Sequence, residues 1–278
     1  MTANATITVD SFRIIISGAT NTGHVRGHNE DAILTDNARG LAVVADGMGG
    51  HATGEVASRI TIDTFAQLTS DAMTLRNILL QAHAAIVAKA IEQPESEGMG
   101  ATAVAVLADT EHFQIAWVGD SRAYHWRRGQ LRQLTRDHSY LEFLLRSGEI
   151  TEQQALNHPQ RNVVTQALGL NSPEPDVINE QWQQGDRLLL CSDGLSDELD
   201  ANAIERLLSA NADTESAVSE LIGAALRNGG RDNVSVVLLE NRSEKLSEFT
   251  GSGRGLLASI GGLTVVIFVV IVWWLRRS

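Results

Sequence analysis

Hydrophobic and polar positions follow two periods along this chain, and each period predicts a different kind of element. Short apolar runs, rich in valine and leucine and bounded by glycine or aspartate, are typical of buried strands. Four such runs are residues 41–45, 103–107, 188–191 and 234–239. Apolar residues spaced three and four positions apart predict helices instead. That spacing occurs in residues 75–86 and 218–225, and helices are also expected at 54–68 and 201–208.

The predicted strands occur in clusters with helices beside them, rather than alternating with helices one for one. A further strand is expected to end at Gly119, and residues 122–134 predict a hairpin that turns at Arg128 and Gly129. Residues 137–184 hold three of the four prolines and no strong strand pattern, so we expect a helical insertion there. This order favours an α+β fold of packed sheets covered by helices over a parallel doubly wound sheet.

An uncharged stretch of 21 residues, 255–275, predicts a membrane span. At ~1.5 Å per residue a helix of this length covers about 31 Å, which matches the hydrocarbon thickness of a bilayer. Trp273 and Trp274 near its end, with Arg276 and Arg277 beyond, are typical interfacial anchors. The alternative is a buried core helix, but such a helix seldom lacks a polar face. We therefore expect one transmembrane helix, a polar linker at 241–254 before it and a short basic tail at 276–278.

The orientation of this span follows from the residues before it. The stretch MTANATITVD has neither a basic start nor an apolar run, so it does not resemble a cleavable signal. Basic residues on the two sides of the span are too balanced for the positive-inside rule to decide. The absent signal and the long acidic domain upstream favour a single-pass protein of the cell inner membrane with its main domain in the cytoplasm.

Charge and cysteine content exclude several classes of function. Since Arg276 and Arg277 are the only charged residues beyond Arg254, the part before the span carries 20 basic and 34 acidic side chains, a formal charge of −14. A domain this acidic is not expected to bind nucleic acid through phosphate contacts. The single cysteine, Cys191, excludes an internal disulfide, a zinc finger and a redox pair. It also excludes the cysteine loop of tyrosine phosphatases, because Asp197 stands where that loop needs an arginine.

Aspartates stand at the boundaries of the predicted strands. Asp46, Asp120 and Asp193 follow the ends of strands, and Asp232 immediately precedes one. In an antiparallel sheet the end of one strand lies beside the start of its neighbour, so these acids can converge on one edge. Crowded carboxylates require cations or raised pKa values, and oxygen ligands favour Mg²⁺ or Mn²⁺. The alternative for each Asp-Gly pair is an ordinary turn, but four independent acids at strand boundaries favour a metal centre.

Two further features fit a phosphate-handling metal site. Gly47 and Gly194 directly follow two of these acids, and a residue without a Cβ lets a backbone oxygen approach a metal. The motif R-G-H-N-E-D places Arg26 four residues before Glu30. A guanidinium suits bidentate contact with phosphate, although such a pair is also common on ordinary surfaces.

In chain order the sequence presents RGHNEDA, ADGMGGH, MGATAVAV, VGDSRAY, LTRDHS, NVVTQALG, LLLCSDGLSD and GGRDNVSVVLL, from about residue 14 to 239. This series closely resembles the metal-dependent Ser/Thr protein phosphatases of type 2C (PPM family) in their bacterial form. The resemblance implies two packed antiparallel sheets flanked by helix pairs. It also implies a catalytic domain at 1–240, with 137–184 as a flap bordering the cleft, and a centre of two Mn²⁺ or Mg²⁺ ions.

Roles carried over by motif position are as follows. The metal ligands are Asp46, which bridges the two ions, Gly47 through its carbonyl, Asp193, Asp232, and Glu30 through water. Asp120, Asp193 and Asp197 match the third-metal site of bacterial members. The resemblance further implies that Arg26 would bind the substrate phosphate, so the expected catalytic set is Arg26, Asp46, Asp193 and Asp232.

One position departs from many relatives. Where they carry a histidine two residues after the bridging aspartate, proposed as the general acid, this chain has Met48. His51 follows three residues later and is not assigned that role, so the identity of the general acid stays open. His138 in the motif LTRDHS is expected to be structural.

Together these features predict an enzyme, a Ser/Thr protein phosphatase that hydrolyses phosphoserine and phosphothreonine with an activated water and no phosphoenzyme. Membrane tethering would raise its effective concentration near a membrane-bound bacterial Ser/Thr kinase or its substrates and so oppose kinase signalling. The alternative from another class is a catalytically silent phosphoprotein sensor on the same fold. A second alternative is an anti-sigma-type phosphatase switch, which usually brings sensory or coiled-coil segments that this sequence lacks.

Overall fold

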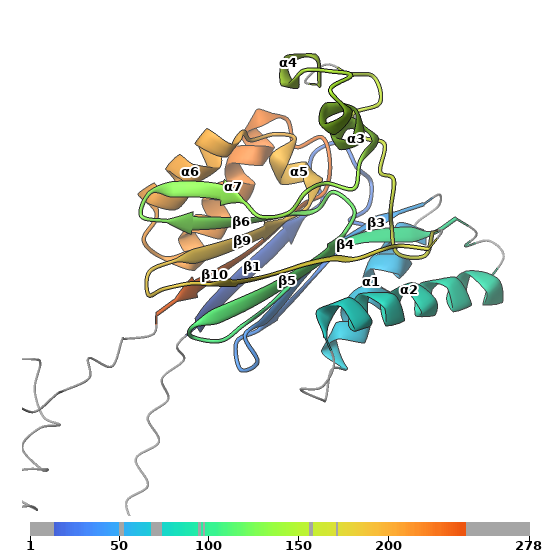
Figure 1. Cartoon of the computed structure of the whole chain (residues 1–278), viewed down its shortest axis with the longest axis horizontal. Helices are drawn as coiled ribbons and strands as arrows, with labels where there is room; N and C mark the ends of the chain where they lie inside the picture. The colour runs from blue at the N-terminus through green and yellow to red at the C-terminus, as the bar shows by residue number, and fades with distance from the viewer. Residues whose placement is uncertain are drawn as a thin grey trace, which may run out of the picture. The chain divides into compact units, whose positions relative to one another are not determined.

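The computed structural model describes residues 14–49, 53–67, 74–93, 96, 98–155, 158–170 and 172–242. Two five-stranded antiparallel sheets pack face to face, with helices on both outer faces (Figure 1). The first sheet has the order β1 (Ile14–Asn21), β10 (Val234–Asn241), β9 (Arg187–Cys191), β6 (Arg122–Arg127), β7 (Gln130–Gln133). The second has the order β2 (Asp31–Asp36), β3 (Leu41–Met48), β4 (Gly100–Ala108), β5 (His112–Val118), β8 (Asp176–Gln181).

The helices cover the outer faces of the two sheets in separate groups. α1 (Thr53–Ala66) and α2 (Leu75–Glu92) pack on the second sheet. α5 (Asp193–Ser196), α6 (Ala201–Ala210) and α7 (Thr214–Asn228) lie on the first. α3 (Tyr140–Ser147) and α4 (Glu152–Ala155) belong to neither group and project from one edge of the sandwich (Figure 1). The expectation of two packed antiparallel sheets flanked by helices is confirmed.

The central strands are buried on both faces because their two sets of alternate residues enter two different cores. In β3, Leu41, Val43 and Ala45 face α1 and α2, whereas Ala42 and Val44 face the other sheet. In β9, Leu188 and Leu190 enter the core between the sheets, and Leu189 and Cys191 enter the core under α6 and α7. This double burial explains why these strands read as continuous apolar runs rather than as alternating ones.

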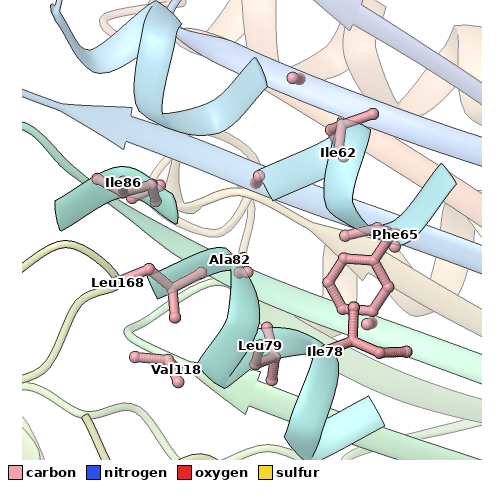
Figure 2. Close-up of a cluster of buried hydrophobic side chains, with 14 of the residues drawn as sticks. Ile62, Phe65, Ile78, Leu79, Ala82, Ile86, Val118 and Leu168 are labelled. Carbon is pink, nitrogen blue, oxygen red and sulfur yellow. The ribbon is translucent and has the colours of Figure 1, made fainter. Parts of the chain in front are cut away.

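The core between α1, α2 and the second sheet is dense and aliphatic (Figure 2). Phe65 of α1 packs with Ile78 and Leu79 of α2, and all three are fully or almost fully buried. Leu168, which lies in the segment that returns from α4 toward β8, enters the same core with no exposed surface. The hydrophobic effect therefore fixes the end of the insertion against the body of the domain.

Polar caps explain where several helices begin. Thr74, Asp200 and Asp213 each accept a hydrogen bond from the backbone N–H three residues on, at the starts of α2, α6 and α7. Ser139 caps α3 in the same way, and Gly148 ends that helix in the left-handed conformation. The hairpin turn is as predicted, with Arg128 and Gly129 both at positive φ between β6 and β7.

The predicted strands at 41–45, 103–107, 188–191 and 234–239 and the predicted helices are confirmed within a few residues. The absence of a strand from residues 137–184 was a wrong expectation, because Asp176–Gln181 forms β8 and pairs with β5. β8 is an edge strand with mostly polar, partly exposed side chains, so it carries no apolar run. The apolar-run analysis also did not indicate β1 and β2.

Of the predicted linker at 241–254, residues 243–254 lie outside the described residues, as do the predicted span at 255–275 and the tail at 276–278. Among the helices that the structure describes, none combines the length and the apolar character needed to cross a bilayer.

Adjacent leucines of α2 give a direct test of the packing between α1 and α2. Leu79 is fully buried, whereas Leu80 is 36% exposed. We expect Leu79→Ala to lower the free energy of unfolding by roughly 2–5 kcal/mol, because it leaves a cavity in a close-packed core. Leu80→Ala is the matched control and should cost less than about 1 kcal/mol. Urea denaturation of both variants measures the difference, and equal losses would contradict the packing described.

Candidate metal centre

At one edge of the sandwich, the strand faces that line the core between the sheets become polar. Alternate residues of a strand lie on the same face, so in β3 Asp46 lies on the face that buries Val44. In β10, Ser235 likewise lies on the face that buries Val237. Ser192 and Asp31 extend β9 and β2 on the same side. The polar edge is thus a continuation of the hydrophobic core by the same period-two rule.

Asp31 and Asp46 are brought together by strand pairing. They are directly opposed residues of β2 and β3. The Ser192 hydroxyl donates to Asp31 Oδ2 at 2.9 Å, so β9 of the other sheet also holds this carboxylate. Asp31 Oδ1 is buried and has no hydrogen-bond partner among the described residues. A buried carboxylate oxygen without a donor is costly, and it suggests that the site is built to receive a cation or an ordered water.

Asn233 ties the loop before β2 to the start of β10. Its side-chain amide donates to the carbonyl oxygens of Thr22 and His28, both at 2.9 Å. Its side-chain oxygen accepts from the backbone N–H of Glu30 at 2.8 Å. These three bonds place Glu30 and the neighbouring Arg26 beside Asp232, although they are some two hundred residues apart in sequence.

Two glycines let backbone segments approach the acids closely. A Cβ on Gly47 would stand 2.0 Å from the Gly54 carbonyl oxygen and 2.6 Å from that of Glu30. The Gly47 N–H donates to the Glu30 carbonyl at 3.1 Å. A Cβ on Gly194 would stand 2.0 Å from the Asn233 carbonyl oxygen. Both positions therefore exclude a side chain because neighbouring backbone approaches so closely, a reason different from the approach of a backbone oxygen to a metal that the sequence suggested.

Burial and mutual repulsion perturb the acids strongly. Burial raises the pKa of Asp46 well above its usual range, and the charges of Asp31 and Asp193 add to this effect. Burial likewise raises the pKa of Asp193, with Asp120 as the next cause. The pKa of Asp31 is raised to about 6, chiefly by burial and against hydrogen bonds from Ser235 and Ser192. The pKa of Asp120 is raised to about 6 by burial and by Asp137. These carboxylates therefore share one electrostatic environment.

Arg26 forms an ion pair with one of the acids at this edge. Its Nη2 donates to Asp232 Oδ2 at 2.6 Å, and its side chain is 51% exposed. The Asp232 hydrogen bond raises the pKa of the Arg26 guanidinium, and Glu30 and Asp193 contribute in the same direction. The exposed part of the guanidinium is free to contact an anion from solvent while Asp232 holds its orientation.

The three acids of the predicted third-metal site line one cavity of about 330 Å³. Asp120, Asp193 and Asp197 form part of its wall together with residues of the insertion. Among the latter, Arg161 lies 3.8 Å from the Asp197 carboxylate. A larger cavity of about 800 Å³ lies at the other end of β4 and β5 and contains none of the predicted site residues.

The donor set fits a hard divalent cation. All predicted ligands are carboxylate or carbonyl oxygens, which Mg²⁺ and Mn²⁺ prefer. In the part of the chain that the structure describes, Asp46, Asp120 and Asp193 form no ion pair with a basic side chain. Within those same ranges, no three acidic, histidine or cysteine side chains have the spacing to hold an ion by themselves. A cation at this edge would therefore need oxygen donors other than these side chains, such as a backbone carbonyl or water.

All the predicted site residues lie in the described part of the chain. The structure brings Arg26, Glu30, Asp46, Gly47, Asp193 and Asp232 to one edge, and Asp120 and Asp197 to the adjoining cavity. Met48 ends β3 beside this edge, and His51 lies outside the described residues. Sequence reasoning assigned no role to Asp31, Asn233 or Ser192. The signal for Asp31 was its place at the start of β2, which the apolar-run analysis did not detect.

Comparison with known proteins agrees with this geometry. Residues 22–229 match the family model described as Protein phosphatase 2C. The chain is 41% identical over 224 residues to the serine/threonine protein phosphatase PstP of Mycobacterium tuberculosis, which covers 78% of this chain but 43% of PstP. It is 37% identical over 235 residues to the serine/threonine phosphatase stp of Listeria monocytogenes, covering 80% of this chain and 93% of stp. The chain thus spans less than half the length of PstP.

Solved structures show the same fold. A crystal structure of Mycobacterium tuberculosis PstP aligns with a TM-score of 0.77 at 38% identity, covering 83% of this chain and 99% of that one. A structure of the PstP catalytic domain in complex with two manganese ions aligns with a TM-score of 0.75 at 36% identity, covering 82% and 97%.

Neutralising Asp46 should reveal the repulsion among the acids. A carboxyl whose pKa is raised on folding binds more protons in the folded state, so its stability contribution falls as pH rises from about 4 through its folded pKa. Without divalent cations, we expect Asp46→Asn to melt at a higher temperature than the wild type at pH 7.5. That advantage should shrink toward pH 5.

Mn²⁺ should reverse the order of the melting temperatures of the wild type and Asp46→Asn. At one hundred times Kd, a cation that binds only the folded state adds about 2.7 kcal/mol, or roughly 5–10 °C in Tm for a domain of this size. The wild type should gain this much and Asp46→Asn far less. Asp63→Asn, an exposed acid of α1, is the control and should behave as the wild type. Equal Mn²⁺ shifts in all three proteins would contradict a cation site at Asp46.

Proposed function

The chain belongs to the protein phosphatase 2C family, and on that premise we propose that it hydrolyses phosphoserine and phosphothreonine in proteins with Mn²⁺ or Mg²⁺. The observation that carries this proposal is the cluster of desolvated aspartates at one sandwich edge with an exposed arginine beside it. The two manganese ions named for the PstP catalytic domain support the same cofactor here.

The described residues fit the roles that the family pattern implies. Asp46 is opposed to Asp31 across β2 and β3 and is repelled by Asp193, so its carboxylate and the Gly47 carbonyl would help to hold the cations. Asp193 and Asp232 would complete the shell of one of them, and Glu30 would hold a water. When bound, the two cations lower the pKa of water and neutralise charge on the phosphoryl group. The ligands must be deprotonated, so metal affinity should fall in acid.

Arg26 would bind the phosphate of the substrate. Its guanidinium is half exposed, and the bond to Asp232 holds it in one orientation. The remaining N–H groups can then bind an anion. A planar fork of this kind binds two phosphate oxygens at once and orients the phosphorus for attack by water. Asp232 is also a predicted metal ligand, so the same side chain would contact a cation and orient the arginine that binds the substrate.

A cysteine phosphoenzyme does not fit this chain. Cys191 is fully buried in the core under α6 and α7, and burial raises the pKa of its thiol to about 12. A thiol that is neutral and out of reach of solvent is a poor nucleophile. This supports direct attack by water, as the sequence analysis predicted.

We further propose that residues 255–275 anchor the enzyme in the cell inner membrane with the phosphatase domain in the cytoplasm. The uncharged run itself supports this proposal. β10 starts beside Asp232 and ends at Asn241, so the chain leaves the domain about 25 Å from the acids. A bacterial Ser/Thr kinase or its substrates are the partners we propose.

Turnover of a phosphothreonine peptide tests the hydrolase directly. We expect the full-length protein in mild detergent to release phosphate with Mn²⁺, to stop in EDTA, and to lose at least about 10²-fold in kcat/KM in Asp193→Ala, because electrostatic stabilisation of the phosphoryl group is lost. Asp63→Ala on the exposed face of α1 is the control and should retain activity. Binding of the phosphopeptide without turnover under either metal would favour the sensor function instead.

Fractionation of bacterial cells tests the anchor. The full-length chain should sediment with inner membranes and resist extraction by high salt and carbonate, because a spanning helix holds it by the hydrophobic effect. A fragment ending at Arg242 should be found in the supernatant. A full-length chain in the salt-extracted supernatant would contradict the anchor but leave the phosphatase activity untouched.

A further inference from the structure

His138, at the root of the insertion, uses each of its polar groups on a different part of the domain. Its side chain is 8% exposed. Its backbone N–H donates to the Gly119 carbonyl at 2.9 Å, and its carbonyl accepts from the Thr165 N–H at 2.7 Å. Its ring Nδ1 accepts from the Gly119 N–H at 3.2 Å, and its Nε2 lies 3.3 Å from Asp176 Oδ2. One residue therefore joins the β5–β6 loop, the returning end of the insertion and β8.

These contacts fix the tautomer of the ring. The backbone N–H of Gly119 can only donate, so Nδ1 must present its lone pair to it. In a neutral ring the proton then sits on Nε2, where it is directed at the Asp176 carboxylate. The ring also stacks on Trp117 of β5, with centroids 6.2 Å apart. The position of the ring is thus determined on both edges and on one face.

Gly119 is the residue directly before Asp120. It has a φ of +102°, and a Cβ there would stand 2.4 Å from the side chain of Thr102. Its conformation is therefore one that only glycine adopts easily, and it must be held by its hydrogen bonds. His138 binds both the N–H and the carbonyl of this residue. The direction in which Asp120 leaves the strand accordingly depends on His138.

The same residue closes the base of the insertion. Thr165 binds the His138 carbonyl, and the adjacent Ser139 forms an isolated β-bridge with Val164. Ser139 caps α3, and it lines the cavity that Asp120 and Asp193 also line. The two ends of the insertion are thereby joined at the wall of the acidic cavity.

We propose that His138 is a positioning residue whose Nδ1 bond to Gly119 holds the Asp120 loop and the root of the insertion in one arrangement, so that cation binding at Asp120 and ordering of α3 are coupled. This inference rests on the proposed metal-dependent function, extended to the third cation site that the sequence predicts at Asp120, Asp193 and Asp197. It acts through Gly119 and requires no contact between His138 and substrate. The opposing possibility is that His138 stabilises the fold in general and affects neither feature selectively.

Two amide substitutions separate the two edges of the ring. In His138→Asn the side-chain oxygen can take the place of Nδ1 and accept from Gly119, while the contact with Asp176 is lost. In His138→Gln the amide can reach Asp176, while the acceptor for Gly119 is lost. The two variants have the same chemistry and differ by one methylene. Asp176→Ala removes only the contact of His138 with β8. Asp120→Ala shows which Mn²⁺ binding site in the calorimetric titration depends on Asp120.

Three measurements on the full-length protein in detergent decide the matter: Tm, Mn²⁺ titration by calorimetry, and amide hydrogen exchange in Gly119–Asp120 and α3. We expect His138→Gln to speed exchange at both places and to weaken the Asp120-dependent class of Mn²⁺ by about 10-fold or more, as is typical of residues that orient ligands. His138→Asn and Asp176→Ala should keep exchange and Mn²⁺ affinity within about threefold of the wild type, even where Tm falls.

Equal effects of the asparagine and glutamine variants on exchange and on Mn²⁺ would overturn the proposal, because the Nδ1 bond would then have no special part. A change in Tm alone would overturn it as well. If Asp120→Ala removes no Mn²⁺ binding site from the titration, the cation assignment at Asp120 and the coupling that we infer from it are wrong. Failure of the wild type to bind Mn²⁺ at Asp46 would instead contradict the proposed function, so the two failures can be told apart. Exchange at α3 would then still decide whether His138 positions the insertion.

Discussion

The rest of this structure depends on the repulsion among carboxylates that strand pairing forces together at a desolvated edge. Asp31 and Asp46 cannot separate, because they are opposed residues of two hydrogen-bonded strands. Asp193 and Asp232 arrive from the other sheet, where β9 and β10 are neighbours. Burial raises the pKa of several of these groups, so the acids make the unliganded fold less stable at neutral pH. A bound cation removes this penalty, which ties stability to metal binding.

The sandwich can hold such a cluster because its hydrophobic core is large and because alternate residues of each central strand face different layers of that core. The three hydrophobic layers contribute stability along most of each strand, and only the last residues of the inner faces are polar. Around the acids, hydroxyl and amide groups replace apolar side chains and satisfy backbone groups that the chain leaves open. Asn233 is the clearest case, since its three hydrogen bonds bring the Arg26 loop to the acids. The site is therefore assembled by secondary structure first and tuned by side chains second.

What the sequence could predict follows from this construction. Strands buried on both faces give continuous apolar runs, so β3, β4, β9 and β10 and the acids at their ends were visible in the sequence. The edge strands β8, β1 and β2 mix buried residues with partly exposed ones and so give no long apolar run, which is why β8 was missed within the insertion and β1 and β2 were not indicated. Asp31 was missed as a site residue for the same reason. The motif series identified the family, but no local pattern could show that Asn233 or His138 would bridge segments far apart in the chain.

The insertion and the acidic edge are best understood as one unit. Arg122 of β6 donates three hydrogen bonds to the carboxylate of Asp137, the residue before His138, and the charge of Asp137 in turn raises the pKa of Asp120. Leu168 then fixes the returning chain in the core of α1 and α2. The insertion is thus held at its start by an ion pair and at its end by hydrophobic burial, while α3 and α4 between them lie at the cavity.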